Sequence, residues 1–224
     1  MSRTNAVDAT QNALTALAEG RVIVITGDRF RRGDMDFAVA AHHASAEAIN
    51  FMATHGRGLI CLAMQQDRAL RLGIGLMNPG KDRQSGRPLG RSIEASEGVT
   101  TGISVADRAH TVKVAVADGA TADDIVSPGH VFPLITAPGG LTERPAAAEA
   151  AVELCLRAGA GDAAVICSIM RDDGEMARLS DIDDLVSRFG LVVADIDALL
   201  EASDGGTAPP ASGIAQPASG EPGQ

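Results

Sequence analysis

The sequence predicts a single-domain α+β fold with α/β-type layers, and three observations support this. A chain of 224 residues, 45% of them hydrophobic, can bury one substantial core. Short apolar runs typical of buried strands alternate with longer stretches of helical spacing. From about Ser203 the composition shifts to Gly, Pro, Ala and Ser, which cannot bury enough apolar surface to offset chain entropy. We therefore expect a flexible N-terminus over 1–11, a folded domain over 12–202 and a disordered tail over 203–224.

The first half of the chain is predicted to alternate helices and strands. A helix is expected from Ala6 to Gly20, because apolar residues recur on one face and a glycine ends it. A second helix is expected after Ser45, a favourable N-cap residue, with Glu47 in its first turn and its end near His55. The apolar face of the first helix comprises Ala13, Leu14, Leu17 and Ala18, and the runs expected as strands are Arg21–Ile25, Phe37–Ala41 and Gly58–Met64.

The second half continues this alternation. The stretch from Met77 to Arg91 has almost no apolar residues, so we expect a mobile loop there. A loop of this length inside a domain is more often functional than idle. The other expected elements are the helices Thr121–Val126, Ala146–Ala158 and Ile182–Phe189, a helix beginning near Ala106, and the strands Ala164–Ile169 and Leu191–Ala194.

Charge and composition exclude several classes of function. The formal net charge of −10 argues against a general nucleic-acid binder, which needs a concentrated basic surface. Aromatic residues make up only 2% of the chain, so base stacking is excluded as a main function. No apolar run approaches the roughly 20 residues that span a bilayer, and Met1–Gln11 has no signal-peptide core. We expect a soluble, cytoplasmic protein that binds neither nucleic acid nor membranes.

The three cysteines indicate buried thiols. Cys61, Cys155 and Cys167 are odd in number, lack CxxC spacing and lie in apolar surroundings. Disulfides and a zinc site are therefore not expected.

The run from Gly98 to Arg108 is the most informative local motif. Its Thr-Thr-Gly-x-Ser core, with Thr100 and Thr101, places hydroxyls and backbone N–H groups at a turn that a glycine relieves. Such a turn suits the oxygens of a phosphate or polyol. The alternative is an ordinary turn that caps the helix beginning near Ala106.

Several separated motifs, in order, resemble the 3,4-dihydroxy-2-butanone 4-phosphate synthase family over roughly Ala13 to Leu200. The resemblance implies an α+β fold, a homodimer with active sites near the subunit interface, and a divalent metal, usually magnesium. It also implies conversion of ribulose 5-phosphate to 3,4-dihydroxy-2-butanone 4-phosphate and formate. The motifs are Asn50–Met52, His55–Cys61, Gly98–Arg108, Ser127–Leu134, Pro138–Gly140 and Asp172–Arg178.

The chain departs from this family where metal and acids are implied. The family's acidic loop reads Asp-Arg-Glu-Asn-Glu-Gly-Asp, and here Phe30 stands at the metal-binding Glu and Arg32 at the second Glu. Ala147 stands at the metal-binding His, followed by Ala148 at a Thr position, and Ser168 stands at a catalytic Glu. We therefore expect no cofactor, and magnesium is implied by the resemblance alone.

The family's substrate-holding positions are largely retained. The resemblance implies that Arg29, Thr100, Thr101 and Arg144 hold a small phosphorylated metabolite, and it leaves Asp34 and Cys61 as catalytic candidates. Relative to the family's loop, Phe30 adds one positive unit, Arg31 one and Arg32 two. This change of four units favours an anion over magnesium.

Two readings of other polar residues stay open. Asp36, on the strand face of Asp34, could rebuild a metal site with His42 and His43, or all three could be solvated strand-end residues. His130 belongs to a motif shared with active relatives and is interpreted as a structural hydrogen-bonding residue.

Three functions follow from these observations. The first is a diverged enzyme that binds a pentulose phosphate or related anionic polyol and performs altered lyase or rearrangement chemistry without magnesium. The second is an inactive paralogue that binds a metabolite or pairs with an active subunit. The third, ordinary synthase activity, requires the family mechanism to run without its metal site and is the least favoured.

Overall fold

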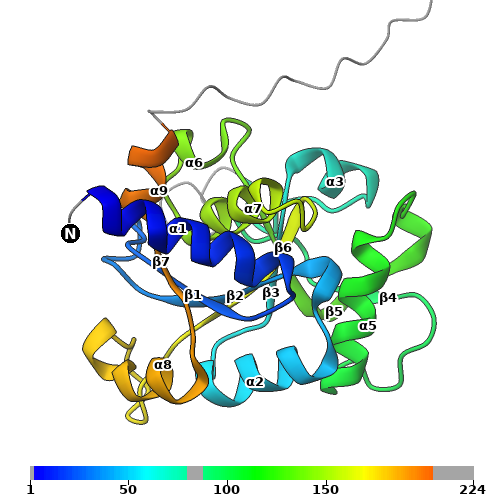
Figure 1. Cartoon of the computed structure of the whole chain (residues 1–224). Coiled ribbons are helices and arrows are strands. Elements are labelled where there is room, and N and C mark those ends of the chain that lie inside the picture. The colour runs from blue at the N-terminus through cyan, green and yellow to red at the C-terminus, as the bar shows by residue number, and fades with distance from the viewer. Residues whose placement is uncertain (1–2, 80–87, 204–224) are drawn as a thin grey trace, which may run out of the picture.

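A mixed β-sheet forms the centre of the computed structural model, which describes residues 3–79 and 88–203 (Figure 1). The strand order in the sheet is β4-β5-β3-β6-β2-β1-β7. The β3–β5 and β1–β7 pairs are parallel and the other neighbouring pairs are antiparallel. The strands are β1 (Ile23–Thr26), β2 (Asp36–Ala40), β3 (Cys61–Met64), β4 (Ile93–Ala95), β5 (Ile125–Ile135), β6 (Ala163–Ser168) and β7 (Val193–Asp195).

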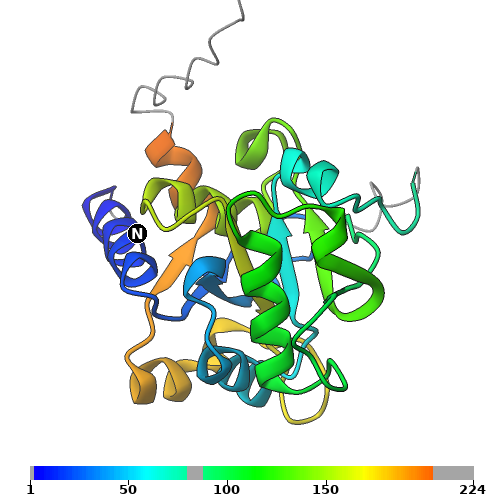
Figure 2. The ribbon, with the colours of Figure 1, turned by 90° about the vertical axis from the view of Figure 1, so that its right-hand side faces the viewer.

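Helices cover both faces of this sheet (Figures 1 and 2). One face packs mainly against α2, α5 and α8, and the other against α1, α7 and α9. The α-helices are α1 (Arg3–Ala18), α2 (Ala46–Gly56), α3 (Gln66–Arg71), α5 (Val105–Val116), α6 (Gly140–Glu143), α7 (Ala147–Arg157), α8 (Asp183–Phe189) and α9 (Ile196–Ser203). The short 3₁₀ turns are η1 (Ala41–His43), η2 (Ala122–Asp124) and η3 (Leu179–Asp181). This layered α-β-α arrangement confirms the predicted fold class.

The strands that carry the site are buried on both faces. In β2, Phe37 and Val39 belong to the core under α2 and α5, whereas Ala38 and Ala40 belong to the core under α1 and α7. The continuous apolar runs of the sequence therefore match strands with both faces covered. The predicted N-cap of α2 is also confirmed, because the Ser45 hydroxyl accepts a hydrogen bond from the backbone N–H of Ala48 at 3.2 Å.

The first helix differs from its prediction at both ends. It begins at Arg3, so it occupies most of the stretch 1–11 for which we predicted a flexible N-terminus. Thr10 is only 6% exposed, which shows that packing extends into this stretch. The buried face uses Ala13, Ala16 and Leu17, while Ala18 is exposed at the end of the helix.

The predicted helix Thr121–Val126 is wrong. Its first part is the single 3₁₀ turn η2, which Thr121 and Asp124 close, since the backbone N–H of Thr121 donates to Asp124 at 2.7 Å. Ile125 then begins β5, because β-branched residues favour a strand that can pair with β4. The predicted tail beyond Ser203 and the centre of the predicted Met77–Arg91 loop lie outside the described residues.

Among the helices of residues 3–79 and 88–203, none combines the length and hydrophobicity that crossing a bilayer would need. The three cysteines are buried and form no disulfide with one another, as predicted.

Candidate functional site

Asp28 organises the loop between β1 and β2. Its side chain is 2% exposed, and its Oδ1 accepts the backbone N–H groups of Phe30 at 2.9 Å and Arg31 at 3.0 Å. Its Oδ2 accepts Arg31 Nε at 2.9 Å and the backbone N–H of Ala147, the first residue of α7, at 3.0 Å. One carboxylate therefore stabilises the conformation of the loop and binds it to the N-terminus of α7, where negative charge is favourable.

The Arg31 side chain of this loop is largely buried. Its side chain is 10% exposed, and its guanidinium forms an ion pair with Asp36 at the start of β2. Nη1 donates to the Ser168 hydroxyl at the end of β6 at 3.3 Å, and that hydroxyl donates to Asp36 Oδ1 at 2.8 Å. Burial alone would lower the pKa of Arg31, but the carboxylates of Asp36 and Asp28 raise it above its ordinary value, so this residue is a permanent cation.

Arg144 forms a second buried ion pair close to the loop. Its Nη1 lies 3.0 Å from Oε1 of Glu149, whose side chain is fully buried in α7. The guanidinium also lies over the Phe30 ring, 5.4 Å from its centroid. Burial raises the pKa of Glu149, while the charge of Arg144 and the backbone N–H of Ala137 oppose this shift.

Arg29 and Asp34 form ion pairs with distant segments. Arg29 donates from Nε at 2.9 Å and from Nη2 at 2.7 Å to Asp197 in α9, and both side chains are more than half exposed. Asp34 accepts Nη1 of Arg178 at 2.8 Å. We call these residues the arginine cluster; it comprises Arg29, Arg31, Arg144 and Arg178 with their partners Asp197, Asp28, Asp36, Glu149 and Asp34.

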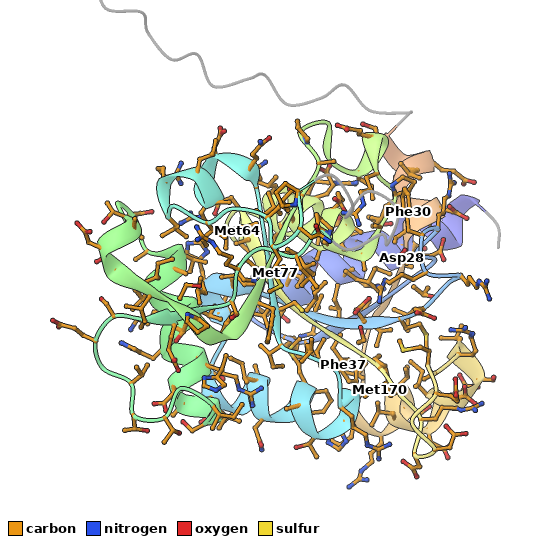
Figure 3. All side chains as sticks on the ribbon, turned by 180° about the vertical axis from the view of Figure 1, so that it is seen from behind. Asp28, Phe30, Phe37, Met64, Met77 and Met170 are labelled. Carbon is orange, nitrogen blue, oxygen red and sulfur yellow. The ribbon has the colours of Figure 1, made fainter. Side chains whose placement is uncertain are left out.

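A very small cavity lies beside Asp28 and Arg31 of the arginine cluster. Its volume is about 10 Å³, which is room for about one water molecule. Figure 3 shows Asp28 and Phe30 together near α9, at the same end of the sheet. A cavity of this size has no room for a sugar phosphate. The cavity is lined by Asp28, Arg31, Pro88, Leu134, Ala146, Ala148 and Ile166.

The loop that carries Thr100 and Thr101, here called the threonine loop, follows the edge strand β4. The Thr100 hydroxyl donates to Asp107 Oδ2 at 2.9 Å, and the backbone N–H of Gly102 donates to the same oxygen at 3.0 Å. These bonds attach the loop to the first turn of α5, and Thr101 remains exposed. Five strand steps of about 4.8 Å separate β4, which precedes this loop, from β1, or roughly 24 Å. Within one chain, the strand that precedes the threonine loop and the strand that precedes the Arg29–Arg31 loop thus lie five positions apart in the sheet.

The structure also places two further predicted residues. His130 Nδ1 lies 3.2 Å from Glu94 Oε1, in line with the structural hydrogen bond expected of it. Cys61, the first residue of β3, is 2% exposed and belongs to the core under α1 and α7, opposite Phe132 and Ile166. Catalysis by Cys61 or Asp34 stays a prediction.

The alternative metal site of Asp36, His42 and His43 is wrong. Asp36 begins β2 and pairs with Arg31, whereas the two histidines lie in η1, beyond the opposite end of this strand. Within residues 3–79 and 88–203, no group of three or more His, Cys, Asp or Glu side chains could hold a metal ion.

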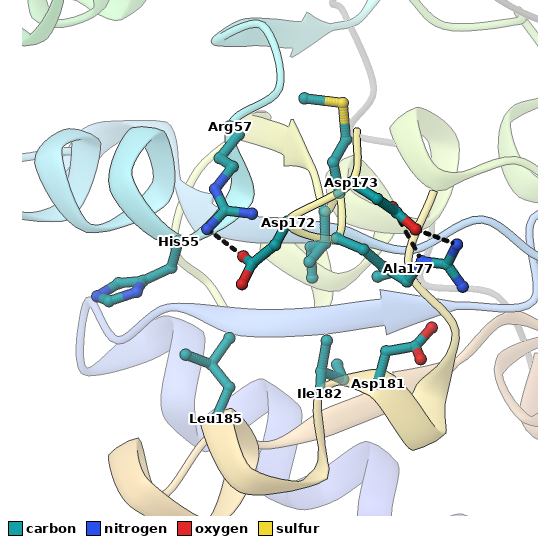
Figure 4. Close-up of a pocket in the computed structure, with 11 residues that line it drawn as sticks. His55, Arg57, Asp172, Asp173, Ala177, Asp181, Ile182 and Leu185 are labelled. Carbon is teal, nitrogen blue, oxygen red and sulfur yellow. Dashed lines mark hydrogen bonds and ion pairs between the residues drawn. The ribbon is translucent and has the colours of Figure 1, made fainter. Parts of the chain in front are cut away.

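A cavity of about 470 Å³ lies apart from the arginine cluster (Figure 4). It is formed by the end of α2, the loop after β6 and the start of α8. Arg57 and Asp172 form an ion pair of 2.5 Å across it, and Arg171 pairs with Asp173 at 2.6 Å. The charged side chains of these two pairs are largely exposed.

Sequence reasoning missed several residues of the arginine cluster. Asp28 had a local signal, since an Asp that precedes a turn commonly accepts N–H groups two or three residues later. The sequence shows the charge of Arg31 but does not show that its side chain is largely buried. Glu149, Arg178 and Asp197 had no local signal, because their partners are distant in sequence or set by burial.

These observations define a three-layer α/β protein with a charged site where the β1–β2 loop meets α7. The chain belongs to the 3,4-dihydroxy-2-butanone 4-phosphate synthase family, which matches it over residues 11–202.

Proteins of known function support this assignment. The chain is 41% identical over 195 residues to the 3,4-dihydroxy-2-butanone 4-phosphate synthase of Pseudomonas aeruginosa, covering 87% of this chain and 53% of that protein. It is 37% identical over 195 residues to the synthase of Klebsiella pneumoniae, covering 87% of this chain and 90% of that protein. The chain thus spans about half the length of the Pseudomonas relative and most of the Klebsiella one.

Solved structures of synthases are also similar to this chain. A crystal structure of a synthase in complex with two magnesium ions has a TM-score of 0.81 at 30% identity, covering 87% of this chain and 96% of that one. A two-domain synthase from A. baumannii has a TM-score of 0.80 at 38% identity, covering 86% of this chain and 57% of that one.

The residues present here do not fit a magnesium ion at the position that the resemblance implies. Phe30 and Ala147 offer no side-chain oxygen or nitrogen, although magnesium demands near-octahedral oxygen ligands. The Arg31 guanidinium instead pairs with the nearby carboxylates Asp28 and Asp36. At an effective dielectric of 20, each unit charge about 4 Å from another is worth about 4 kcal/mol, so Arg31 opposes the attraction that Asp28 and Asp36 would exert on a divalent ion.

Proposed function

We propose that this protein is a diverged member of the synthase family that binds a pentulose phosphate or related anionic polyol and acts on it by altered lyase or rearrangement chemistry without magnesium. The carrying observation is the arginine cluster, which stands where the resemblance implies metal ligands and acids, with Phe30, Ala147 and Ser168 in their places. Ordinary synthase activity, the function in the relatives' names, is least favoured because those ligands and acids are missing.

Binding of an anion is supported by the weakness of the exposed pairs. The Arg29 and Asp197 side chains are 55% and 59% exposed, and ion pairs of this kind contribute about 0–1 kcal/mol. A phosphate could therefore take the place of Asp197 at little cost. Arg32 is exposed in the same loop, and Arg144 stacks on Phe30 beside it.

We further propose a cytoplasmic homodimer. The threonine loop follows β4 and the loop that carries Arg29 and Arg31 follows β1, and these two strands lie roughly 24 Å apart across the sheet. The resemblance implies active sites near a subunit interface. A second copy could therefore supply Thr100 and Thr101 to the β1–β2 loop of the first.

The second candidate function is an inactive paralogue that binds a metabolite or serves as the partner of an active subunit. It is favoured by the cavity of about 10 Å³ and by the internal pairing of Arg29, Arg31, Arg144 and Arg178. A site closed in this way holds its fold without a ligand.

A formate assay tests the proposed function first. Purified protein is incubated with ribulose 5-phosphate and magnesium, with the Klebsiella relative as positive control. We expect that this protein does not release formate at the rate of the Klebsiella relative. Formate at that rate would overturn the proposal and establish ordinary synthase activity.

Calorimetry with ribulose 5-phosphate then separates the two candidate functions. We expect binding that is unchanged by magnesium and is weakened several-fold by Arg29→Ala. The matched control is Arg21→Ala, because Arg21 forms a similarly exposed pair with Glu19 but lies outside the cluster. Absence of heat with ribulose 5-phosphate and with inorganic phosphate would reject binding and favour the partner subunit.

A further inference from the structure

The Arg31 guanidinium joins four segments of the chain. Its Nε contacts Asp28 at 2.9 Å in the loop after β1, and its terminal nitrogens contact Asp36 in β2 and Ser168 in β6. Asp28 in turn accepts the backbone N–H of Ala147 in α7 at 3.0 Å. The cation therefore lies at the point where the loop, two strands and a helix meet.

The two carboxylates at this point need a cation. The Asp28 and Asp36 side chains are 2% and 1% exposed, and a buried carboxylate is costly unless it is paired and hydrogen-bonded. A divalent ion can meet this need with its charge and its preference for oxygen. A guanidinium can meet it as well, because its planar fork donates to two acceptors and stays charged at every relevant pH.

We propose that Arg31 is a built-in replacement for a divalent cation, so that this chain completes and stabilises the site without metal. The position of the guanidinium supports this. It bridges Asp28 and Asp36 among the three positions, Phe30, Ala147 and Ser168, at which the resemblance implies metal ligands and an acid. The proposal goes beyond the proposed function, because it concerns how the site is held together and its test needs no substrate.

The wild-type protein provides the first test. We expect its melting temperature to be the same in millimolar magnesium and in EDTA, and calorimetry with magnesium alone to give no saturable heat. A melting temperature that rises with magnesium, or a saturable binding isotherm, would overturn the proposal. This first test uses only the wild-type protein, so it does not require a variant to fold.

Removal of the cation provides the second test. Arg31→Ala leaves two buried carboxylates without it, and we expect the melting temperature to fall by roughly 10 °C. Low millimolar guanidinium, which fits the space of the missing group, should recover part of this loss, and magnesium should now raise the melting temperature too. The control Arg29→Ala removes an exposed pair in the same loop and should respond to neither ion.

Two further variants keep the test decisive if Arg31→Ala folds poorly. Arg31→Lys retains a cation, so we expect it to be more stable than Arg31→Ala and its melting temperature to be unchanged by magnesium. The double variant Arg31→Ala with Asp36→Asn has one carboxylate fewer and should be more stable than Arg31→Ala alone. If the double variant is less stable, or if Arg31→Ala and wild type respond equally to guanidinium, Arg31 does not replace a cation here.

Discussion

The Asp28 carboxylate accepts a hydrogen bond from the backbone N–H of Ala147 at 3.0 Å, across 119 positions of sequence. Ala146, the N-cap residue of α7, makes no side-chain cap of its own. Asp28 therefore caps this helix from the loop after β1. Its negative charge also complements the positive end of the helix.

Asp28→Ala is expected to be strongly destabilising. The change leaves the Arg31 guanidinium with one carboxylate fewer and removes the acceptor of three backbone N–H groups. Loss of one partner from a buried charged network costs about 3–5 kcal/mol, and urea unfolding would measure it. Asp28→Asn keeps one oxygen acceptor and should cost less. Equal losses for both variants would mean that the charge alone matters and the cap does not.

The strands β1, β2, β3 and β6 could be predicted from the sequence because they are almost entirely buried. Continuous apolar runs such as Arg21–Ile25 therefore marked them directly. The strands β4 and β5 escaped prediction, and the first half of β5 is largely exposed and contains Pro128 and Gly129, which are poor strand residues. The helix α3 also escaped, since Gln65 provides no side-chain cap to signal its start.

The site could be predicted only in part. The resemblance groups Arg29, Asp34 and Arg144 in one substrate site. It does not reveal that Arg29 pairs with Asp197 or Asp34 with Arg178, because these partners are 168 and 144 positions away. Such pairings depend on the packing of whole elements, which local patterns do not encode.

Arg144→Ala is expected to destabilise the protein in a pH-dependent way. It leaves the fully buried Glu149 without its cation, at a cost of about 3 kcal/mol at neutral pH. Burial already raises the pKa of Glu149 above its ordinary 4.5, so its favourable contribution exists below that value and is lost as the pH rises through the raised value. The loss should therefore be smaller near pH 4.5 in urea unfolding. Adding Glu149→Gln should recover stability at neutral pH and remove this pH dependence; an unchanged dependence would assign it to another group.

Alkaline pH should destabilise the protein through Cys155. Burial, assisted by the charge of Asp162, raises the pKa of this thiol from 9.0 to about 12. Its contribution is thus complete below pH 9 and is lost as the pH rises toward 12, by up to about 1.4 kcal/mol per pH unit. The chain has no tyrosine and only two lysines, so few other groups titrate in this window. Cys155→Ala should flatten the dependence in unfolding experiments; an equally steep fall in this variant would exclude Cys155 as its source.

Restoring the family's metal ligands should succeed only when Arg31 is also removed. A variant with acids and an imidazole at the substituted positions regains candidate ligands, but the Arg31 cation still repels a divalent ion at short range. We therefore expect the four-fold variant to bind magnesium only weakly in calorimetry, and the addition of Arg31→Asn to raise its affinity at least about tenfold. A five-fold variant that binds no better than wild type would mean that these loop positions are misaligned with the family, and equal binding by the two variants would mean that Arg31 lies too far from the metal position to matter. The four restoring substitutions are Phe30→Glu, Arg32→Glu, Ala147→His and Ser168→Glu.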